Sequence, residues 1–311
     1  MLCWLIAPFL FYVIITQSRN LGDFKWLIFN HSFWCLTLES LLGLVKPLFL
    51  SPAAGGFQVG IFRDYGSFKT CGIAAVFCFI FSSNCILGLS ATLASRYLLV
   101  FPSSLTKWFT LKKALIAAVG LPIIAYIVIL MVFYPILQTD TSTIHQWAFE
   151  YDPILKEYFD EPTFLFLPHF YHDYIDIPIL SLLIILTFSA FSVILFFLYQ
   201  MTNTKTTVSS KLQRSLLLSS VIQIVITCFF LFMPFIFFFI FIKYDIQNTA
   251  SFMCILMCIF TSHCFIEFIA TLYFVSPYRN FILRIFRKKV RKSNVSIRTV
   301  QVSAITVSRY Y

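Results

Sequence analysis

Long apolar runs alternate with shorter polar, charged or proline-containing stretches along most of the chain. Most of these runs reach about 20 residues, the length that an α-helix needs to cross the ~30 Å hydrocarbon core of a bilayer. The pattern predicts an all-α membrane protein, a bundle of seven transmembrane helices. We expect the spans at residues 1–16, 27–50, 71–95, 114–134, 177–200, 215–242 and 250–275.

The first predicted span is shorter than the others. Sixteen residues extend only ~24 Å as a helix, and Pro8 interrupts the run. The segment lacks the basic start and the small-residue cleavage site of a signal peptide. The pattern favours a first span that is incomplete at its N-terminus; a genuinely short helix with local bilayer thinning is the alternative.

The composition excludes a soluble globular domain. Of the 311 residues, 59% are apolar and 12% are charged, whereas soluble domains have about 25% charged residues. The 39 Phe residues, with only 9 Gly and 12 Pro, also exclude a disordered or collagen-like chain. The nine Cys residues lack CxxC or Cys/His metal spacing and lie in or beside apolar runs, so we interpret them as small core hydrophobes.

The distribution of Lys and Arg, which give the chain its net charge of +10, predicts how the chain is oriented in the membrane. An odd number of spans places the two termini on opposite sides of the membrane. If the C-terminus is cytoplasmic, 18 of the 23 Lys and Arg residues fall on the inner side, together with one acid, Asp23. Because cytoplasmic loops carry the excess of Lys and Arg, we predict an outer N-terminus and a cytoplasmic C-terminus. The basic charge therefore requires no nucleic acid partner.

Two segments outside the spans have predicted roles. Residues 281–289 indicate a short basic amphipathic helix on the inner leaflet, where it would attract anionic lipid. We assign residues 1–290 to the seven-helix domain and residues 291–311 to a disordered cytoplasmic tail. The loop of residues 136–176 is the longest, and its length suits a lid over the outer mouth of the bundle.

Four strongly polar residues lie inside the predicted spans, where such side chains are costly and by default mark function. His263 and Glu267 share one face of the seventh span because they are four residues apart. The interpretation is a polar switch whose partners change between two helix arrangements; a static set of interhelical hydrogen bonds is an equally weighted alternative. The proposed switch residues are Glu39, Asn84, His263 and Glu267.

The inner ends of three spans carry basic and aromatic residues. Arg96 and Tyr97 end the third span, Lys211 and Arg214 open the sixth, and Pro277, Tyr278 and Arg279 follow the seventh. Taken alone, such an Arg is usually a topology anchor. Pro234 lies in the outer half of the sixth span, where it predicts a kink.

The sequence gives little support to an enzyme, a metal centre or a cofactor site. His169, His172 and Asp173 could suggest a metal cluster, but no HExxH motif or carboxylate pair accompanies them. We interpret them as polar residues of an outer loop. The chain also lacks a glycine-rich phosphate-binding loop, so we expect no cofactor.

The order of these motifs resembles that of nematode serpentine chemoreceptors, most closely class H, within the seven-helix chemosensory G protein-coupled receptors. The resemblance extends from about residue 9 to residue 290. Its motifs are Lys25-Trp26 through His31-Ser-Phe-Trp34 with Glu39, then Pro47, Pro52 and Ala54-Gly55, then Ser95-Arg96-Tyr97, then Lys211-Leu-Gln-Arg214 with Gln223, and finally His263 with Pro277-Tyr278-Arg279.

The resemblance implies an olfactory or gustatory receptor that binds a small environmental chemical and activates a heterotrimeric G protein. It implies the plasma membrane, in the cilium of a sensory neuron. G protein coupling would fall to Arg96, Tyr97, Lys211, Arg214, Tyr278 and Arg279, and hinge motion to Pro234 and Pro277. An aromatic pocket would be lined by Phe77, Phe79, Phe81, Phe235 and Phe238.

The sequence departs from the family pattern at three points. The family usually has a longer first span, a small hydroxyl residue near Glu267, and Asn where this chain has Ser95. Cys71 occupies the place of a third-span disulfide cysteine of rhodopsin-like receptors, but residues 136–176 contain no Cys. Two other classes stay open: a ligand-gated seven-helix channel subunit, which predicts the reverse topology, and a transporter, which predicts internal repeats.

Overall fold

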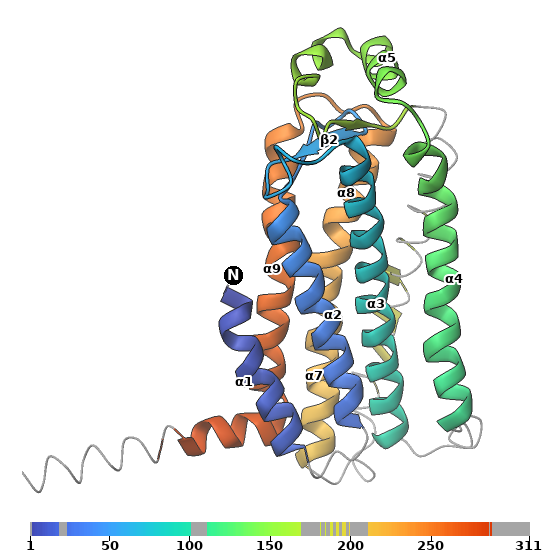
Figure 1. Ribbon diagram of the computed structural model, residues 1–311. Coiled ribbons are helices and arrows are strands. Elements are labelled where there is room, and N and C mark those ends of the chain that lie inside the picture. The colour runs from blue at the N-terminus through green and yellow to red at the C-terminus, as the bar shows by residue number, and fades with distance from the viewer. Residues whose placement is uncertain are drawn as a thin grey trace, which may run out of the picture.

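The computed structural model describes residues 2–18, 24–100, 111–168, 211–285 and 287, with isolated residues between 181 and 199; of residues 97–100, 111–119, 121 and 211–214 it describes the backbone alone. Long helices run side by side (Figure 1). They are α1 (Leu2–Gln17), α2 (Phe24–Val45), α3 (Phe68–Val100), α4 (Leu111–Leu137), α7 (Lys211–Thr227), α8 (Met233–Lys243) and α9 (Ala250–Phe274).

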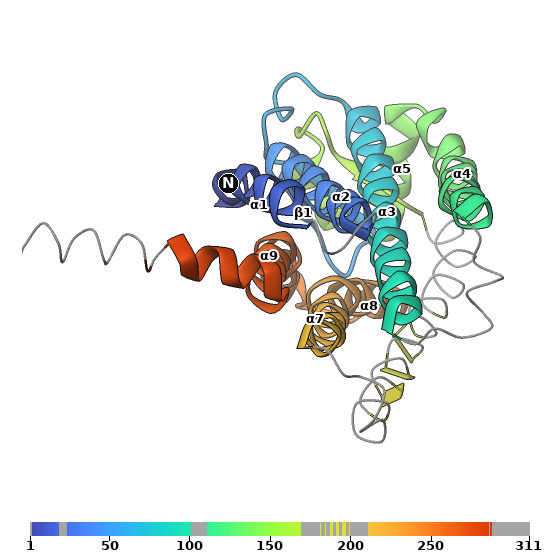
Figure 2. The ribbon, with the colours of Figure 1, turned by 90° about the horizontal axis from the view of Figure 1, so that it is seen from below.

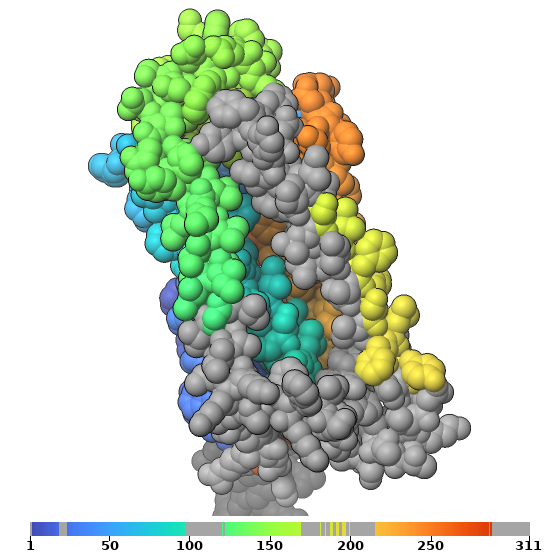
Figure 3. Space-filling view, turned by 90° about the vertical axis from the view of Figure 1, so that its right-hand side faces the viewer, coloured from blue at the N-terminus to red at the C-terminus, as the bar shows by residue number. Residues whose placement is uncertain are grey.

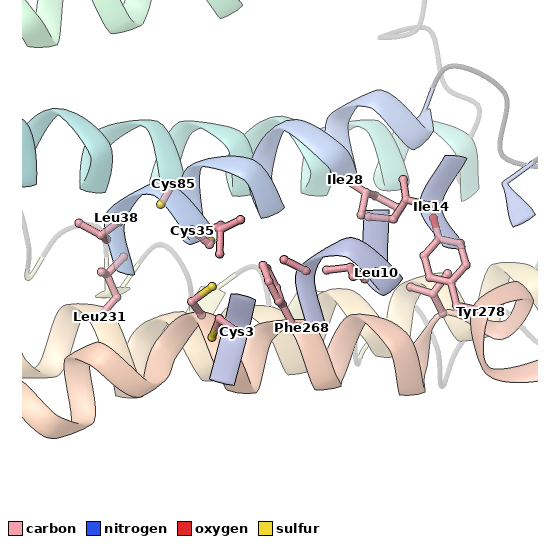
Figure 4. Close-up of a cluster of buried hydrophobic side chains, with 14 of the residues drawn as sticks. Cys3, Leu10, Ile14, Ile28, Cys35, Leu38, Cys85, Leu231, Phe268 and Tyr278 are labelled. Atoms are coloured by element: carbon pink, nitrogen blue, oxygen red, sulfur yellow. The ribbon is translucent and has the colours of Figure 1, made fainter. Parts of the chain in front are cut away.

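The helices α2, α3, α7, α8 and α9 form the body of the bundle, with α1 at one edge beside α2 and α9 and α4 at another edge beside α3 (Figure 2). A single cluster of buried apolar side chains connects these helices, including Leu10, Ile28, Leu216 and Phe268 (Figure 4). Many large apolar side chains remain on the outer surface of the helices, for example Leu5 and Met131, which are 77% and 71% exposed. That arrangement suits a bundle surrounded by lipid, where apolar surface needs no cover.

Four described helical segments are long and apolar enough to cross a membrane. They are Phe24–Val45, Phe68–Arg96, Ser215–Lys243 and Ala250–Phe274. A fifth is counted if Pro122–Leu137 is joined to Thr141–Tyr151, which turns away from it by 91°. The helix Leu2–Gln17 is apolar but shorter, as the sequence pattern predicts.

The fifth predicted span, residues 177–200, lies mostly outside the described residues. Those that are described between 181 and 199 are helical. They include large apolar side chains on the molecular surface, such as Phe188 and Leu195, which are 70% and 66% exposed. Figure 3 shows these residues in yellow along one side of the molecule.

The prediction that the second span extends to residue 50 is wrong, because α2 ends at Val45. Pro47 disfavours a helical backbone at the residue before it, and Lys46 adopts a left-handed conformation with φ of 46°. The carbonyls of Leu44, Val45 and Lys46 then accept hydrogen bonds from the backbone of Ile61, Gly60 and Val59 at 3.0–3.1 Å. The chain beyond Lys46 forms a strand instead of continuing the helix.

A small antiparallel sheet, which the sequence pattern does not predict, closes one end of the bundle. Its order is β1 (Pro47–Phe49), β2 (Gly55–Gln58) and β3 (Leu165–Phe166). Above it lie α5 (Thr141–Tyr151) and the 3₁₀ helix η3 (Pro153–Tyr158), so residues 138–166 cover this end (Figures 1 and 3). We call this segment the lid. Its position agrees with the expectation for the longest loop.

The sixth predicted span is irregular at its middle. Helix α7 passes into a π-helical turn, η4 (Cys228–Phe232), before α8 begins. Pro234 cannot donate a hydrogen bond to the carbonyl four residues earlier, and its ring would collide with that carbonyl in a regular helix. The wider turn relieves this conflict, with the Met233 N–H donating to the Cys228 carbonyl five residues back. The irregularity therefore precedes the proline.

The closest helix packing joins α2 and α3 and depends on Gly88. A Cβ atom at this position would lie 3.2 Å from the Cα and 3.3 Å from the Cβ of His31. Small residues let membrane helices approach each other in this way. The position holds His31 against α3.

Replacing Gly88 by leucine should therefore force α2 and α3 apart. We expect the free energy of unfolding to fall by about 1–3 kcal/mol, the usual cost of overpacking. The measurement is the melting temperature of the purified protein in detergent. Gly43→Leu is the matched control, because a Cβ at Gly43 of α2 has no neighbour within 4 Å. Equal melting temperatures for the two variants would contradict the prediction.

Candidate functional site

A buried polar network joins α2, α7 and α9 in the middle of the bundle. Glu267 of α9 is completely buried, and its Oε1 accepts a hydrogen bond from Nε2 of Gln223 on α7. The same amide nitrogen lies 3.3 Å from the Thr271 hydroxyl. Nε2 of His31 on α2 lies 3.5 Å from the Glu267 carboxylate. One carboxylate thus connects three helices.

His31 extends this network to α3. Its Nδ1 lies 3.1 Å from the backbone carbonyl oxygen of Cys85, a distance at which it hydrogen-bonds in the tautomer that protonates Nδ1. Its ring also contacts the Cys35 sulfur one turn along α2, at 3.7 Å from Nε2. Sequence reasoning did not include His31 in the polar switch. The indication was available, because a His inside an apolar span is costly unless it is paired.

The predicted switch residues fall into three places. His263 is buried one turn before Glu267 and interacts electrostatically with it. Asn84 lies apart from this network, because its Oδ1 accepts a 2.7 Å hydrogen bond from the Tyr126 hydroxyl of α4. Glu39 lies beside Cys264 of α9. The structure therefore brings His263 and Glu267 together, and it pairs Asn84 with α4 instead.

Arg96 lies near the C-terminal end of α3 and joins it to α7 and α2. Its side chain is completely buried. Nη1 donates hydrogen bonds to the hydroxyls of Ser219 and Ser220 at 3.3 and 3.2 Å, and the guanidinium lies 5.4 Å from the centre of the Phe24 ring. Among the residues that the structure describes, the Nε and Nη2 atoms have no hydrogen-bond partner. A buried guanidinium with free donors is poised to accept new partners if the helices separate.

The end of α9 turns sharply into a second helix, residues 276–285 (Figures 1 and 2). Pro277 lies in its first turn, a position at which the missing N–H costs nothing. Tyr278 is completely buried, and its hydroxyl shares a 2.7 Å hydrogen bond with Ser18, just after α1. Ser215 of α7 holds the other side by donating to the Phe274 carbonyl at 2.6 Å. This helix includes residues 281–285 of the predicted tail helix, whose residues 286, 288 and 289 lie outside the described part of the chain, and its start is anchored beside α1 and α7.

The remaining residues predicted for G protein coupling lie at the same end. Tyr97, Lys211 and Arg214 belong to the ends of α3 and α7, but their side chains fall outside the described part of the chain. Arg279 is half-buried in the tail helix beside Tyr278. The structure thus places the backbone of all these positions at one end of the bundle, around the C-terminal ends of α3 and α9 and the N-terminal end of α7.

Two of the five predicted pocket residues meet in the bundle. Phe79 of α3 and Phe235 of α8 stack with ring centres 6.1 Å apart, and they continue to Phe133 and Phe260 at 5.6 and 5.1 Å. These four rings connect α3, α4, α8 and α9.

The other three predicted pocket residues lie elsewhere. Phe81 packs against Phe77 and Trp34, whereas Phe238 contacts Phe49 of β1. Phe77 is 46% exposed on the surface of the bundle. Because the chain has 39 Phe residues, the sequence pattern could not distinguish the two predicted pocket residues that meet in the bundle from the three that lie elsewhere.

The lid is held without a disulfide, since all nine cysteines are free. The backbone N–H of Gln58 in β2 donates to the Thr163 hydroxyl at 3.0 Å. Arg63 forms a two-pronged ion pair with Glu161, at 3.1 Å from Nε and 2.6 Å from Nη2. Hydrogen bonding to Glu161 raises the pKa of the Arg63 guanidinium. Strand pairing and these polar contacts hold the lid against the end of the bundle, a role that a disulfide from Cys71 would otherwise have.

The lid also contacts the loop between α8 and α9. The Tyr151 hydroxyl donates a 2.6 Å hydrogen bond to Oδ1 of Asp245. Burial and this neighbouring carboxylate raise the pKa of the Tyr151 phenol, so it stays protonated at neutral pH and can donate. Asp245 has a left-handed backbone with φ of 45°, which places its carboxylate at the turn after α8. Displacement of the lid would therefore be transmitted to the C-terminal end of α8.

Comparison with known proteins adds the family. A search of curated proteins found no match to the chain. A family model described as the serpentine-type seven-transmembrane G protein-coupled chemoreceptors, Srh, matches residues 5–288. That range includes α1, the whole helical bundle, the lid and the turn at Pro277. The chain therefore belongs to the Srh family of serpentine seven-transmembrane chemoreceptors.

Proposed function

We propose that the protein binds a small environmental chemical from the lid side of the bundle and activates a heterotrimeric G protein at the opposite end. The observation that carries this proposal is the burial of Arg96 between α3 and α7, where its guanidinium donates to Ser219 and Ser220 and two of its nitrogens have no partner within the described part of the chain. The contact of Arg96 with α7 would hold the inner ends of α3 and α7 together in the inactive state. Separation of these helices would expose the guanidinium of Arg96 to the G protein.

The route from ligand to Arg96 runs through the irregular span. A ligand that packs against Phe79 and Phe235 would favour one position of α8 over another, by no more than its difference in affinity for the two states. The π-helical turn of η4 connects α8 to α7. Such turns often occur at functional sites because they are easier to reshape than regular helix. Movement of α7 would withdraw Ser219 and Ser220 from Arg96.

The Glu267 network would act as the second switch in this mechanism. Gln223 lies on α7, so movement of that helix must also change its hydrogen bonds to Glu267 and Thr271. The alternative is that the network only holds α2, α7 and α9 together in every state. Loss of ligand response without loss of folded protein in Gln223→Leu would favour the switch.

We further propose that the receptor works in the plasma membrane of a sensory neuron, at the cilium, with its C-terminus in the cytoplasm. The helix of residues 276–285 continues toward a run of Lys and Arg at 287–292. This arrangement suits contact with anionic lipid of the inner leaflet. An epitope after Tyr311 should be labelled only in permeabilised cells, and labelling of intact cells would overturn the orientation.

The function is tested by nucleotide exchange on a purified G protein with the receptor in lipid vesicles. A screen of small volatile and water-soluble chemicals in a heterologous cell supplies the ligand. We expect ligand-stimulated exchange in wild type and its loss in Arg96→Ala, with both proteins reconstituted in equal amounts. A ligand-evoked current in vesicles without any G protein would instead support the channel alternative.

A further inference from the structure

Two thiols and a carboxylate from three helices meet in the bundle at a place that the proposed receptor mechanism does not use. They belong to Cys3 of α1, Glu39 of α2 and Cys264 of α9. The two sulfur atoms and a carboxylate oxygen all lie within 4.8 Å of one another. Cys3 is completely buried and Cys264 is 3% exposed, while Glu39 is half-buried.

We propose that Cys3, Glu39 and Cys264 form a zinc site that ties α1 to α2 and α9. Thiolates bind Zn²⁺ at about 2.3 Å and carboxylates at about 2.0–2.2 Å. In a tetrahedral site these bonds place two sulfur atoms about 3.8 Å apart and a sulfur and an oxygen about 3.5 Å apart. The observed arrangement needs side-chain shifts of only about 1 Å to reach that geometry.

The ligand types select the metal. Thiolates are soft ligands that exclude Mg²⁺ and Ca²⁺, whereas zinc accepts sulfur and carboxylate oxygen in the same site. Zinc binding replaces the protons of the two thiols, so two protons are released and the metal offsets most of the resulting negative charge. Buried anionic groups are otherwise costly, and metal coordination is one of the few ways to keep them.

A third cysteine, Cys35, lies in the same buried cluster as the proposed zinc ligands. Cys264 also interacts electrostatically with Cys35 of α2, and Cys35 contacts His31. Three protein ligands leave one position of a tetrahedral zinc open, for water or for Cys35 after rotation of its side chain. Figure 4 shows Cys3 and Cys35 in the same buried cluster. The zinc would brace the short α1, which otherwise contacts α2 and α9 through apolar side chains.

The test measures zinc bound to the full chain. The protein carries a peptide epitope in place of a histidine tag, is purified in detergent, stripped with a chelator and equilibrated with Zn²⁺. We expect about one zinc per chain by elemental mass spectrometry. The variant with both Cys3→Ser and Cys264→Ser should bind at least about tenfold more weakly. The matched control is the double variant Cys254→Ser and Cys258→Ser, which replaces two exposed thiols of the same α9 and should bind zinc as the wild type does.

A second measurement keeps the proposal testable if the double variant does not fold. Cobalt in place of zinc in the wild-type protein should give a thiolate-to-cobalt charge-transfer absorption, and Glu39→Gln should shift that spectrum. Three results would overturn the site: zinc retained by the Cys3 and Cys264 variant, bound cobalt without the thiolate band, or a Cys3–Cys264 disulfide in the protein isolated without reductant.

Discussion

Replacing Glu267 by alanine should destabilise the protein more than any other single polar change in α9. The carboxylate is completely buried and serves Gln223 of α7 and His31 of α2. Alanine removes the carboxylate from two buried partners and leaves Gln223 the Thr271 hydroxyl at 3.3 Å, and breaking a buried pair in this way costs about 3–5 kcal/mol. We expect the melting temperature in detergent to fall by about 10 °C. A thiol-reactive dye that detects newly exposed cysteines gives the measurement.

Two variants separate this network from a general effect of mutating α9. Ser262→Ala removes an exposed hydroxyl of the same helix that donates only to the Cys258 carbonyl, so we expect a change within about 0.5 kcal/mol. Glu267→Gln keeps an acceptor for Gln223 and should lie between the two. If Glu267→Ala melts at the temperature of Ser262→Ala, the network contributes nothing to folding and the argument from burial is wrong.

The helices of this protein could be predicted from sequence because a bilayer demands continuous apolar runs. The seventh predicted span, residues 250–275, differs by one residue from α9 (Ala250–Phe274). The end of α2 was missed because apolar residues continue past it, while Pro47 and the left-handed Lys46 end the helix through backbone geometry. The sheet was missed because its strands have two to four residues, and β3 pairs with a strand more than a hundred residues earlier.

The candidate site was predictable only in part, because periodicity gives the face of a helix but not the helix that it meets. Spacing placed His263 and Glu267 on one face of α9, and the structure agrees. The same reasoning could not show that Asn84 would bind Tyr126 of α4 instead. Nothing in the sequence indicated that Ser219 and Ser220 would contact Arg96, since single hydroxyls are common in membrane helices. Their role follows only from the position of Arg96.

Removing the hydroxyls of both Ser219 and Ser220 should activate the receptor without ligand. These serines accept the two hydrogen bonds by which Arg96 of α3 holds α7. A hydrogen bond from a charged donor contributes about 1.5–3 kcal/mol, so an inactive state that loses both would give up about 3 kcal/mol or more, a factor of roughly 100 or more in its preference over the active state. We expect ligand-independent nucleotide exchange on the G protein to rise by at least about 10-fold, because the rise is limited by the rate of the fully active receptor.

Variants of Arg96 itself distinguish two roles of this residue, holding α7 in the inactive state and contacting the G protein. Arg96→Met removes the hydrogen bonds to α7 and also the cation that would meet the partner, so it should abolish exchange with and without ligand. Ser90→Ala is the control, because Ser90 is an exposed residue of the same α3 that donates only to the Ile86 carbonyl. If the double serine variant shows the basal activity of Ser90→Ala at equal surface expression, the contact of Arg96 with α7 does not hold the receptor inactive. If Arg96→Met keeps full ligand response, the guanidinium has no part in activation.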